Sequence, residues 1–215
     1  KIILKKLLKN LNNMKVKICG LQPARDVDLC INLGVDFLGF VFYAKSPRNV
    51  NLNEIEKLNN FNKQGSRFVA VTVNPNDEFI KNVVLGNFDY IQLHGSENRE
   101  RVEKIKSMGI KIIKAIKIYK EKDIDDYKNY DNADIILFDT PGMEKSIKFP
   151  NELISKLPHG ERYALAGSIS QNNIENIKKL GVSFCDLSSS LERDTEIGYK
   201  DHLKIKNFIY KVNGL

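Results

Sequence analysis

Short apolar runs alternate along the chain with longer segments in which apolar residues recur at helical spacing. The short runs are rich in β-branched residues and predict strands. The predicted strands cover residues 15–19, 37–42, 67–73, 90–94, 111–118, 134–139, 163–166 and 184–188. The predicted helices cover residues 23–33, 52–62, 77–85, 96–108, 121–127, 150–157, 171–180 and 201–212.

Eight strand–helix units follow one another without a linker or a break in composition. This order predicts a single (β/α)8 barrel of parallel strands over residues 14–215, a class of α/β fold. A doubly wound open sheet is the rival architecture. Eight consecutive units and the lack of an early GxGxxG motif favour the closed barrel.

The first thirteen residues, KIILKKLLKNLNN, form a short N-terminal extension to this pattern. Their leucines and isoleucines recur at helical spacing with lysines between them, which allows a surface helix, a frayed tail or residues upstream of the natural start. The sequence from Met14 looks like a natural beginning, so we favour the last two interpretations for residues 1–13.

The net charge of +7 is concentrated in the extension. Four lysines lie in the first thirteen residues, which contain no acidic residue, so the remainder carries only +3. With no nucleic-acid-binding motif or basic stripe, this argues against a nucleic-acid partner and suits a small anionic substrate. No apolar run approaches the length that spans a membrane.

The cysteines and histidines give no sign of a metal site. There are three cysteines, Cys19, Cys30 and Cys185, an odd number without CxxC spacing, and three widely separated histidines without HExxH spacing. A disulfide framework or a zinc site is therefore not expected, and the thiols fit a cytoplasmic location.

Residues whose side chains can act in catalysis or binding collect at the carboxyl ends of the predicted strands, where barrel enzymes place their active sites. Each residue also has an ordinary interpretation, such as core packing for the cysteine or helix capping for the aspartate, but their convergence at one end favours function. The Gly/Ser loops after the last two strands suggest a phosphate site. The set comprises Cys19, Arg48, His94, Asp139, Gly167, Ser168, Ser188, Ser189 and Ser190.

The sequence resembles the phosphoribosylanthranilate isomerase family of tryptophan biosynthesis. The resemblance extends from Met14 to the C-terminal end of the chain. It is carried by KVKICGLQ, GVDFLGFVFYAKSPRNV, VAVTVN, IQLHGSE, LFDT, LAG, DLSSSLE and GYKD. It implies an isomerase that converts N-(5-phosphoribosyl)anthranilate into the corresponding 1-deoxyribulose 5-phosphate by an Amadori rearrangement, without a metal or organic cofactor.

The resemblance implies a general base at Cys19 and a general acid at Asp139. The base would need a pKa below its free value of about 8.5, and the acid a pKa above about 3.9. Arg48 would bind the anthranilate carboxylate. The remaining implied substrate-binding residues are His94 and Asp186, which line the pocket, and Gly167, Ser168, Ser188 and Ser189, which hold the phosphate.

Three departures from the family pattern bear on the site. Ser168 and Ser190 stand where the family usually has glycine, and only residues 141–146 separate Thr140 from Ile147-Lys148-Phe149, where the family usually has a longer loop. We therefore expect the same chemistry in a less enclosed site.

Two other functions remain open at this point. One is another phosphate-binding barrel enzyme, with Lys114 or Lys117 as a catalytic lysine of a related sugar-phosphate synthase. The other is an inert barrel that serves as a binding protein, although Cys19 and Asp139 are both retained. The sequence is compatible with both a monomer and a homodimer. It is also compatible with a related aminoaldose from histidine biosynthesis as a second substrate.

Overall fold

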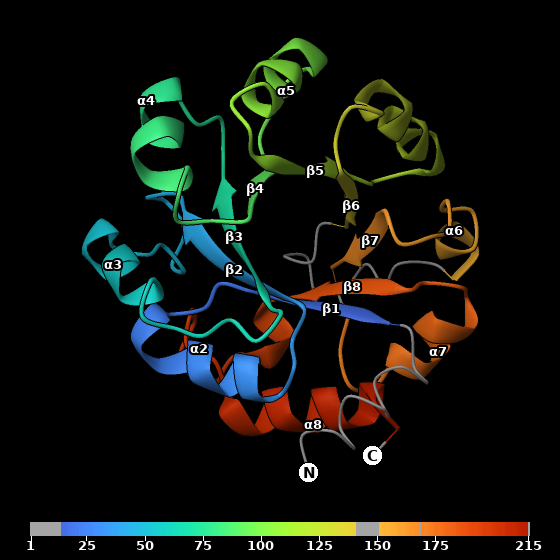
Figure 1. Ribbon diagram of the computed structural model, residues 1–215. Coiled ribbons are helices and arrows are strands. Elements are labelled where there is room, and N and C mark those ends of the chain that lie inside the picture. Colours follow the sequence, from blue (N-terminus) through green and yellow to red (C-terminus); the bar gives the residue numbers. More distant parts are fainter. Residues whose placement is uncertain (1–13, 141–150, 168, 215) are drawn as a thin grey trace.

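The computed structural model describes residues 14–140, 151–167 and 169–214. Its eight strands are all parallel and close into a barrel in chain order (Figure 1). The strands are β1 (Lys15–Cys19), β2 (Phe37–Phe42), β3 (Arg67–Thr72), β4 (Tyr90–Leu93), β5 (Lys111–Lys117), β6 (Ile135–Asp139), β7 (Tyr163–Ala166) and β8 (Phe184–Leu187). The predicted barrel is thereby confirmed, whereas the extension 1–13, the loop 141–146 and Ser168 lie outside the described residues.

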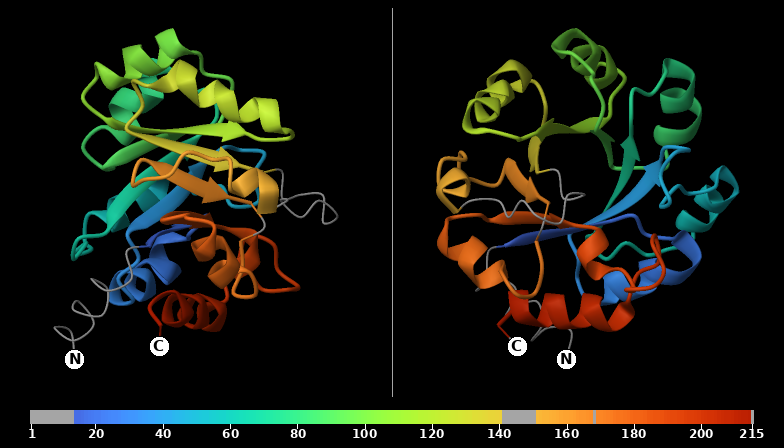
Figure 2. Two further views of the ribbon diagram at one scale, coloured as in Figure 1. Left: turned by 90° about the vertical axis from the view of Figure 1, so that its right-hand side faces the viewer. Right: turned by 180° about the vertical axis from the view of Figure 1, so that it is seen from behind.

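Helical segments connect the strands and surround the barrel, as the side and rear views show (Figure 2). They are α2 (Pro23–Asn32), η1 (Leu52–Glu54), α3 (Ile55–Leu58), α4 (Asp77–Phe79), η2 (Ile80–Val84), α5 (Arg99–Lys106), η3 (Glu121–Tyr130), α6 (Asn151–Ile154), α7 (Ile174–Lys179), η4 (Ser189–Leu191) and α8 (His202–Val212). None of these described helices is both long and apolar enough to cross a membrane.

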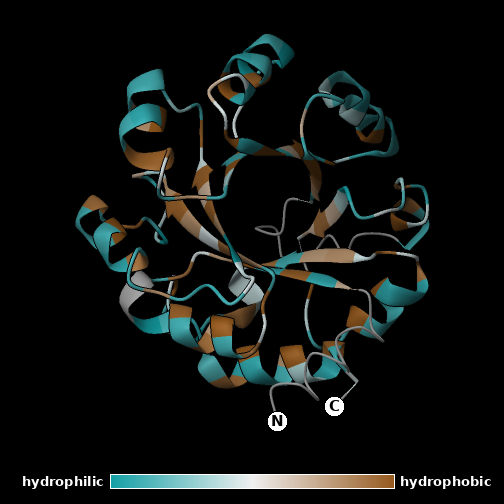
Figure 3. Cartoon of the chain, viewed as in Figure 1, coloured by the Kyte–Doolittle hydropathy of each residue, from teal (hydrophilic) through white to brown (hydrophobic). Residues whose placement is uncertain are grey.

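The alternation of side chains along each strand divides the core into two parts. Outward-facing residues of the strands pack against the apolar sides of the helices, which show as brown stripes facing the barrel (Figure 3). Inward-facing residues form a separate cluster inside the barrel, in which Phe37 stacks on Phe184 with ring centroids 5.0 Å apart. The barrel interior is therefore a packed core, and a substrate can be bound only at its ends.

Several helices are shorter or tighter than predicted. The predicted helix 52–62 is a 3-10 turn followed by four α-helical residues, and η3 is 3-10 throughout. The chain after α3 reads Asn59-Asn60-Phe61-Asn62, and asparagine favours turns over helix interiors because its side chain competes for backbone hydrogen bonds. The strands, which carry the site, differ from prediction by at most one residue at an end.

Candidate active site

Five of the predicted site residues meet at the carboxyl ends of the strands. Cys19 ends β1, Asp139 ends β6, His94 follows β4, Asp186 lies in β8 and Ser188 follows β8. Asp139 and His94 both influence Asp186 electrostatically, and Asp186 in turn influences Cys19. The predicted acid and base therefore belong to one electrostatic cluster at one mouth of the barrel.

An ion pair lies beneath Cys19 inside the barrel. Lys17 stands opposite Asp186 in the register of β1 and β8, and its Nζ donates to Asp186 Oδ2 at 2.7 Å. Both residues are buried, at 1% and 7% exposure. The positive charge of Lys17 also acts on the Cys19 side chain, which lies on the same inward face of β1. Lys17 thus joins the predicted base to a carboxylate predicted to bind substrate.

The surroundings of Cys19 do not produce the low pKa that its role as a base led us to expect. Burial raises the pKa of the thiol above its usual value, because a thiolate loses solvation there. The positive charges of Lys17 and Lys200 act in the opposite direction, while Asp186 adds to the increase. The resting side chain is therefore a thiol, and the two lysines limit the cost of forming the thiolate.

Asp139 is paired with His94 across the mouth. His94 Nε2 lies 3.0 Å from Asp139 Oδ2, and Gln92 Nε2 donates to His94 Nδ1 at 2.9 Å. With Nδ1 accepting this bond, a neutral His94 ring carries its proton on Nε2, the atom that faces Asp139 Oδ2. Gln92 is only 1% exposed. His94 therefore contacts the predicted acid directly, in addition to lining the pocket.

Arg48 is held in place by Glu192. Its Nε and Nη2 donate to the two carboxylate oxygens at 2.6 and 2.8 Å, and Lys200 Nζ donates to Glu192 Oε1 at 3.1 Å. Burial opposes the charge on Glu192, but Arg48 and Lys200 outweigh it and lower the pKa of the carboxyl. The Arg48 stem lies against Gly20, where a Cβ would come within 2.7 Å of Arg48 Cδ. Among the described residues Nη1 has no hydrogen-bond partner, so the outer edge of the guanidinium can donate to a second carboxylate.

The two loops predicted to bind phosphate differ in their backbone conformation and in the hydrogen-bond donors that they leave available. Ser188 Oγ donates to the Cys19 carbonyl at 3.1 Å, so its single hydroxyl proton is engaged within the protein. Ser189 is exposed and begins the 3-10 turn η4. Gly167 has a φ of +89°, the left-handed conformation that favours glycine. Of the described residues predicted to hold a phosphate, Ser188 thus uses its hydroxyl to support the Cys19 backbone, while Gly167 contributes a glycine-favouring turn and Ser189 an exposed residue.

Gly167→Ala tests how closely the loops after β6 and β7 approach. A Cβ at this position would lie 2.0 Å from Thr140 Oγ1, in a backbone conformation that strains any L side chain. We expect urea unfolding to show a loss of about 2–4 kcal/mol, from both the strain and the overlap. Gly109→Ala is the matched control, because Gly109 has a φ of +93° but no neighbour within 4 Å of its Cβ position. Equal losses in the two variants would contradict the close approach.

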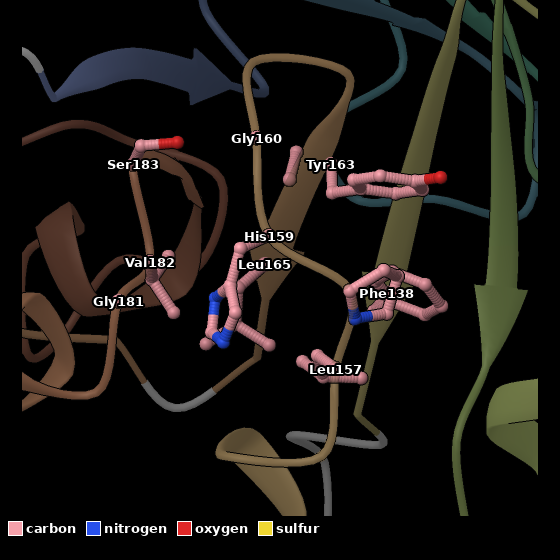
Figure 4. A pocket seen from close by; sticks show the side chains of 11 residues that line it. Phe138, Leu157, His159, Gly160, Tyr163, Leu165, Gly181, Val182 and Ser183 are labelled. Atoms are coloured by element: carbon pink, nitrogen blue, oxygen red, sulfur yellow. The ribbon is translucent and has the colours of Figure 1, made fainter.

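The opposite end of the barrel carries a pocket without these groups. It is lined by the segments that lead into β7 and β8, among them Leu157, His159, Gly181 and Ser183 (Figure 4). His159 packs over Gly181, where a Cβ would come within 2.7 Å of its ring. Residues at this end of a barrel usually serve stability, and His159 fits that role.

Sequence analysis missed four residues that shape the site. Lys17, Gln92, Glu192 and Lys200 each contact a predicted site residue. All four lie inside the motifs quoted for the family resemblance, in KICG, QLHG, DLSSSLE and GYKD. Their positions in these motifs were the available signal, but a charge within a strand gave no indication of its partner.

The described residues contain no group of three or more His, Cys, Asp or Glu side chains arranged to hold a metal ion. The site instead offers a thiol, carboxylates, an imidazole, an arginine and two buried lysines. This set can donate and accept protons and bind anions.

Comparison with known proteins agrees with this arrangement. The family model for N-(5'phosphoribosyl)anthranilate (PRA) isomerase matches residues 16–211. The chain is 35% identical over 213 residues to N-(5'-phosphoribosyl)anthranilate isomerase of Listeria monocytogenes, covering 94% of this chain and 100% of that one. A structure of the dimeric phosphoribosylanthranilate isomerase of Thermotoga maritima, in a monomeric form, has a TM-score of 0.78 and 29% identity over 94% of this chain and 100% of that one.

A further structure of a phosphoribosylanthranilate isomerase contains reduced 1-(o-carboxyphenylamino)-1-deoxyribulose 5-phosphate, with a TM-score of 0.80 and 29% identity over 94% of this chain and 100% of that one. The match to the family model extends over nearly the whole described barrel and includes every predicted site residue. The chain therefore belongs to the N-(5'-phosphoribosyl)anthranilate isomerase family.

Proposed function

We propose that this chain catalyses the Amadori rearrangement of N-(5-phosphoribosyl)anthranilate to 1-(2-carboxyphenylamino)-1-deoxyribulose 5-phosphate in tryptophan biosynthesis. Family membership supports this reaction. The observation that carries the proposal is that a thiol and a carboxylate lie at the same mouth of the barrel. The Cys19 thiol has Lys17 as an ionisable neighbour, and the Asp139 carboxyl has His94. Acid–base catalysis suffices for both the ring opening and the tautomerisation, so the proposal includes no metal or organic cofactor.

In the proposed mechanism Asp139 donates a proton to the furanose ring oxygen, and the ring opens to a Schiff base. The Cys19 thiolate then removes the proton from C2′ of the sugar, which gives an enolamine that tautomerises to the ketone. His94 supports this role because its ring proton faces the Asp139 carboxylate that results from the first step. The second oxygen of Asp186, Oδ1, is buried without a protein partner among the described residues. We assign to it a hydrogen bond from a sugar hydroxyl.

The two anionic groups of the substrate would be held by different residues. Arg48 would bind the anthranilate carboxylate through its outer edge, while Glu192 fixes its orientation. Gly167, Ser168 and Ser189 would hold the phosphate, with Ser188 supporting Cys19. Ser168 lies outside the described residues, and its role rests on the family resemblance.

Arg48→Lys tests the carboxylate site. A lysine keeps the charge but cannot form the two-pronged contacts of a guanidinium with Glu192 and the substrate. We expect KM to rise about 10- to 100-fold, corresponding to the loss of a charge-assisted hydrogen bond of about 1.5–3 kcal/mol. Inhibition by ribose 5-phosphate, which has no carboxylate, should stay unchanged. Arg101→Lys, at an arginine paired with Asp77, is the control. A KM change equal to that of the control would contradict the assignment.

The synthase alternative loses support from the placement of Lys114. This lysine points away from the barrel interior and donates to Glu97 Oε2 and the Gly95 carbonyl, both at 2.8 Å. It is 2% exposed. Its donors are used to fix the loop after β4, so it is not placed to act on a substrate at the mouth.

A coupled assay tests the proposed function. The unstable substrate is made in place from phosphoribosyl pyrophosphate and anthranilate with a phosphoribosyltransferase, and the loss of its fluorescence is followed. Turnover well above the uncatalysed rate is expected from the full chain. No turnover with the folded protein would rule out the function. We further propose a cytoplasmic enzyme, monomeric or homodimeric, without a nucleic-acid partner.

A further inference from the structure

The ion pair beneath Cys19 is unusual for the place in which it lies. The neighbouring inward-facing positions are apolar, among them Val69, Ile113 and Leu137. Removing an ammonium and a carboxylate from water is costly, and apolar replacements of a buried ion pair often leave stability unchanged or improved. Lys17 and Asp186 are both buried. The pair is therefore poorly explained by stability alone, and its contact with Cys19 points to a role in the chemistry.

The backbone brings the Lys17 ammonium to the sulfur of Cys19. The two residues are two apart on β1, so both side chains point into the barrel. On the neighbouring strand β2, a Cβ at Gly39 would lie 3.2 Å from both Cys19 Sγ and Lys17 Nζ. The absence of a side chain at Gly39 leaves the space in which these two groups meet.

The other charges around the sulfur have opposing effects. Asp186 lies on β8 and repels a thiolate, while Lys200, between β8 and α8, attracts one. Lys200 Nζ is tied to the Ser188 carbonyl at 3.0 Å and to Glu192. Lys17 is the cation that shares the space above Gly39 with the Cys19 sulfur, and its charge acts on the thiol more strongly than that of Lys200. It is also the cation whose charge is supported by a carboxylate directly opposite in the sheet.

We propose that Lys17 is a positioning residue for the base: its ammonium holds the Cys19 sulfur and stabilises the thiolate, and Asp186 keeps the lysine charged. The thiol releases its proton to water, and the resulting thiolate, stabilised by the Lys17 ammonium, is the form that removes the C2′ proton. The catalytic part of this inference rests on the proposed function. The stabilisation of the thiolate is a property of the protein alone and can be measured without substrate.

Alkylation by iodoacetamide measures the thiolate directly, because the thiolate is the reacting form. Cys30 and Cys185 are fully buried, and Cys19 is partly exposed. The Cys19→Ala protein gives the background rate. An opposite charge at this range shifts a pKa by about 1–3 units. Lys17→Met should therefore slow alkylation at about pH 8 by tenfold or more, and should move the pH profile of the rate upward.

A second variant guards against unfolding, because Lys17→Met alone leaves Asp186 buried without its partner. The double variant Lys17→Met/Asp186→Asn carries no buried charge at this place. It should still react more slowly than the wild type, by about threefold or more, because Lys17 acts on the Cys19 thiol more strongly than Asp186 does. The matched control is Lys114→Met/Glu97→Gln, which removes a buried ion pair outside the barrel interior. It should alkylate at the wild-type rate.

A wild-type rate in folded Lys17→Met or in the double variant would overturn the proposal, as would an equal decrease in the control. These outcomes are independent of turnover. If the full chain shows no isomerase activity and Lys17→Met still slows alkylation, the proposed function fails and the assignment of Lys17 stands. If the isomerase is active and Lys17→Met leaves alkylation unchanged, the proposed function stands and the assignment of Lys17 fails.

Discussion

Cys19→Ala is expected to lower kcat by about 10³-fold, within the range of about 10²–10⁴ that a general base contributes. Alanine removes the sulfur and leaves the Lys17–Asp186 pair in place. Cys19→Ser is expected to lose nearly as much, because a hydroxyl forms its anion far less readily than a thiol. The coupled fluorescence assay measures both variants, and the unfolding of each in urea shows whether the barrel is intact.

Cys30→Ala is the matched control for this loss. Cys30 is a fully buried thiol on α2 and is not one of the predicted site residues. Its removal should cost some stability and leave kcat near the wild-type value. If Cys19→Ala retained more than a tenth of wild-type kcat, another group would have to remove the C2′ proton, and the assignment of the base would be wrong.

Asp139→Asn is the second change with a large expected effect, again about 10²–10⁴-fold on kcat. The amide matches the carboxyl in shape, and its oxygen can still accept the bond from His94 Nε2. It has no acidic proton to give to the ring oxygen, so ring opening should become limiting. Binding of reduced 1-(o-carboxyphenylamino)-1-deoxyribulose 5-phosphate, whose sugar is already open, should change little.

The control for this variant lies at the other end of the same strand. Asp134 immediately precedes β6 and accepts the Ile112 amide at 2.8 Å. Asp134→Asn should leave kcat unaffected, because the residue lies at the amino end of the barrel. The acid assignment would fail if Asp139→Asn kept kcat within tenfold of the wild type, or if it lost analogue binding and turnover in equal measure.

The strands and the two proposed catalytic residues were predictable because each depends on local sequence. A buried strand needs a short run of β-branched residues, and Asp139 stands out because it ends such a run. Helix lengths were less predictable. The four-residue α3 depends on how far an asparagine-rich segment resists helix formation, and tertiary packing decides that balance.

The partners of the site residues could not be predicted in this way. Lys17 was visible only as a polar residue in a strand, and its partner Asp186 lies 169 positions away. The roles of Glu192 and Lys200 likewise become visible only in the folded chain, where the loop after β2 brings Arg48 to Glu192. The pKa of Cys19 was predicted in the wrong direction, because the requirement of the chemistry was considered without the desolvation that burial imposes.

The contacts between β1 and β8 also have a consequence for how the chain folds. Lys17 pairs with Asp186 across the closing seam of the barrel, and Arg48 reaches Glu192 over 144 positions. Contacts between such distant segments form late, because closing long loops costs entropy before the contacts compensate for it. A nascent chain can therefore bury most of its core while the Lys17 ammonium beside the thiol still lacks its carboxylate partner, Asp186. The chemistry of the mouth becomes available only when the last strand joins the first.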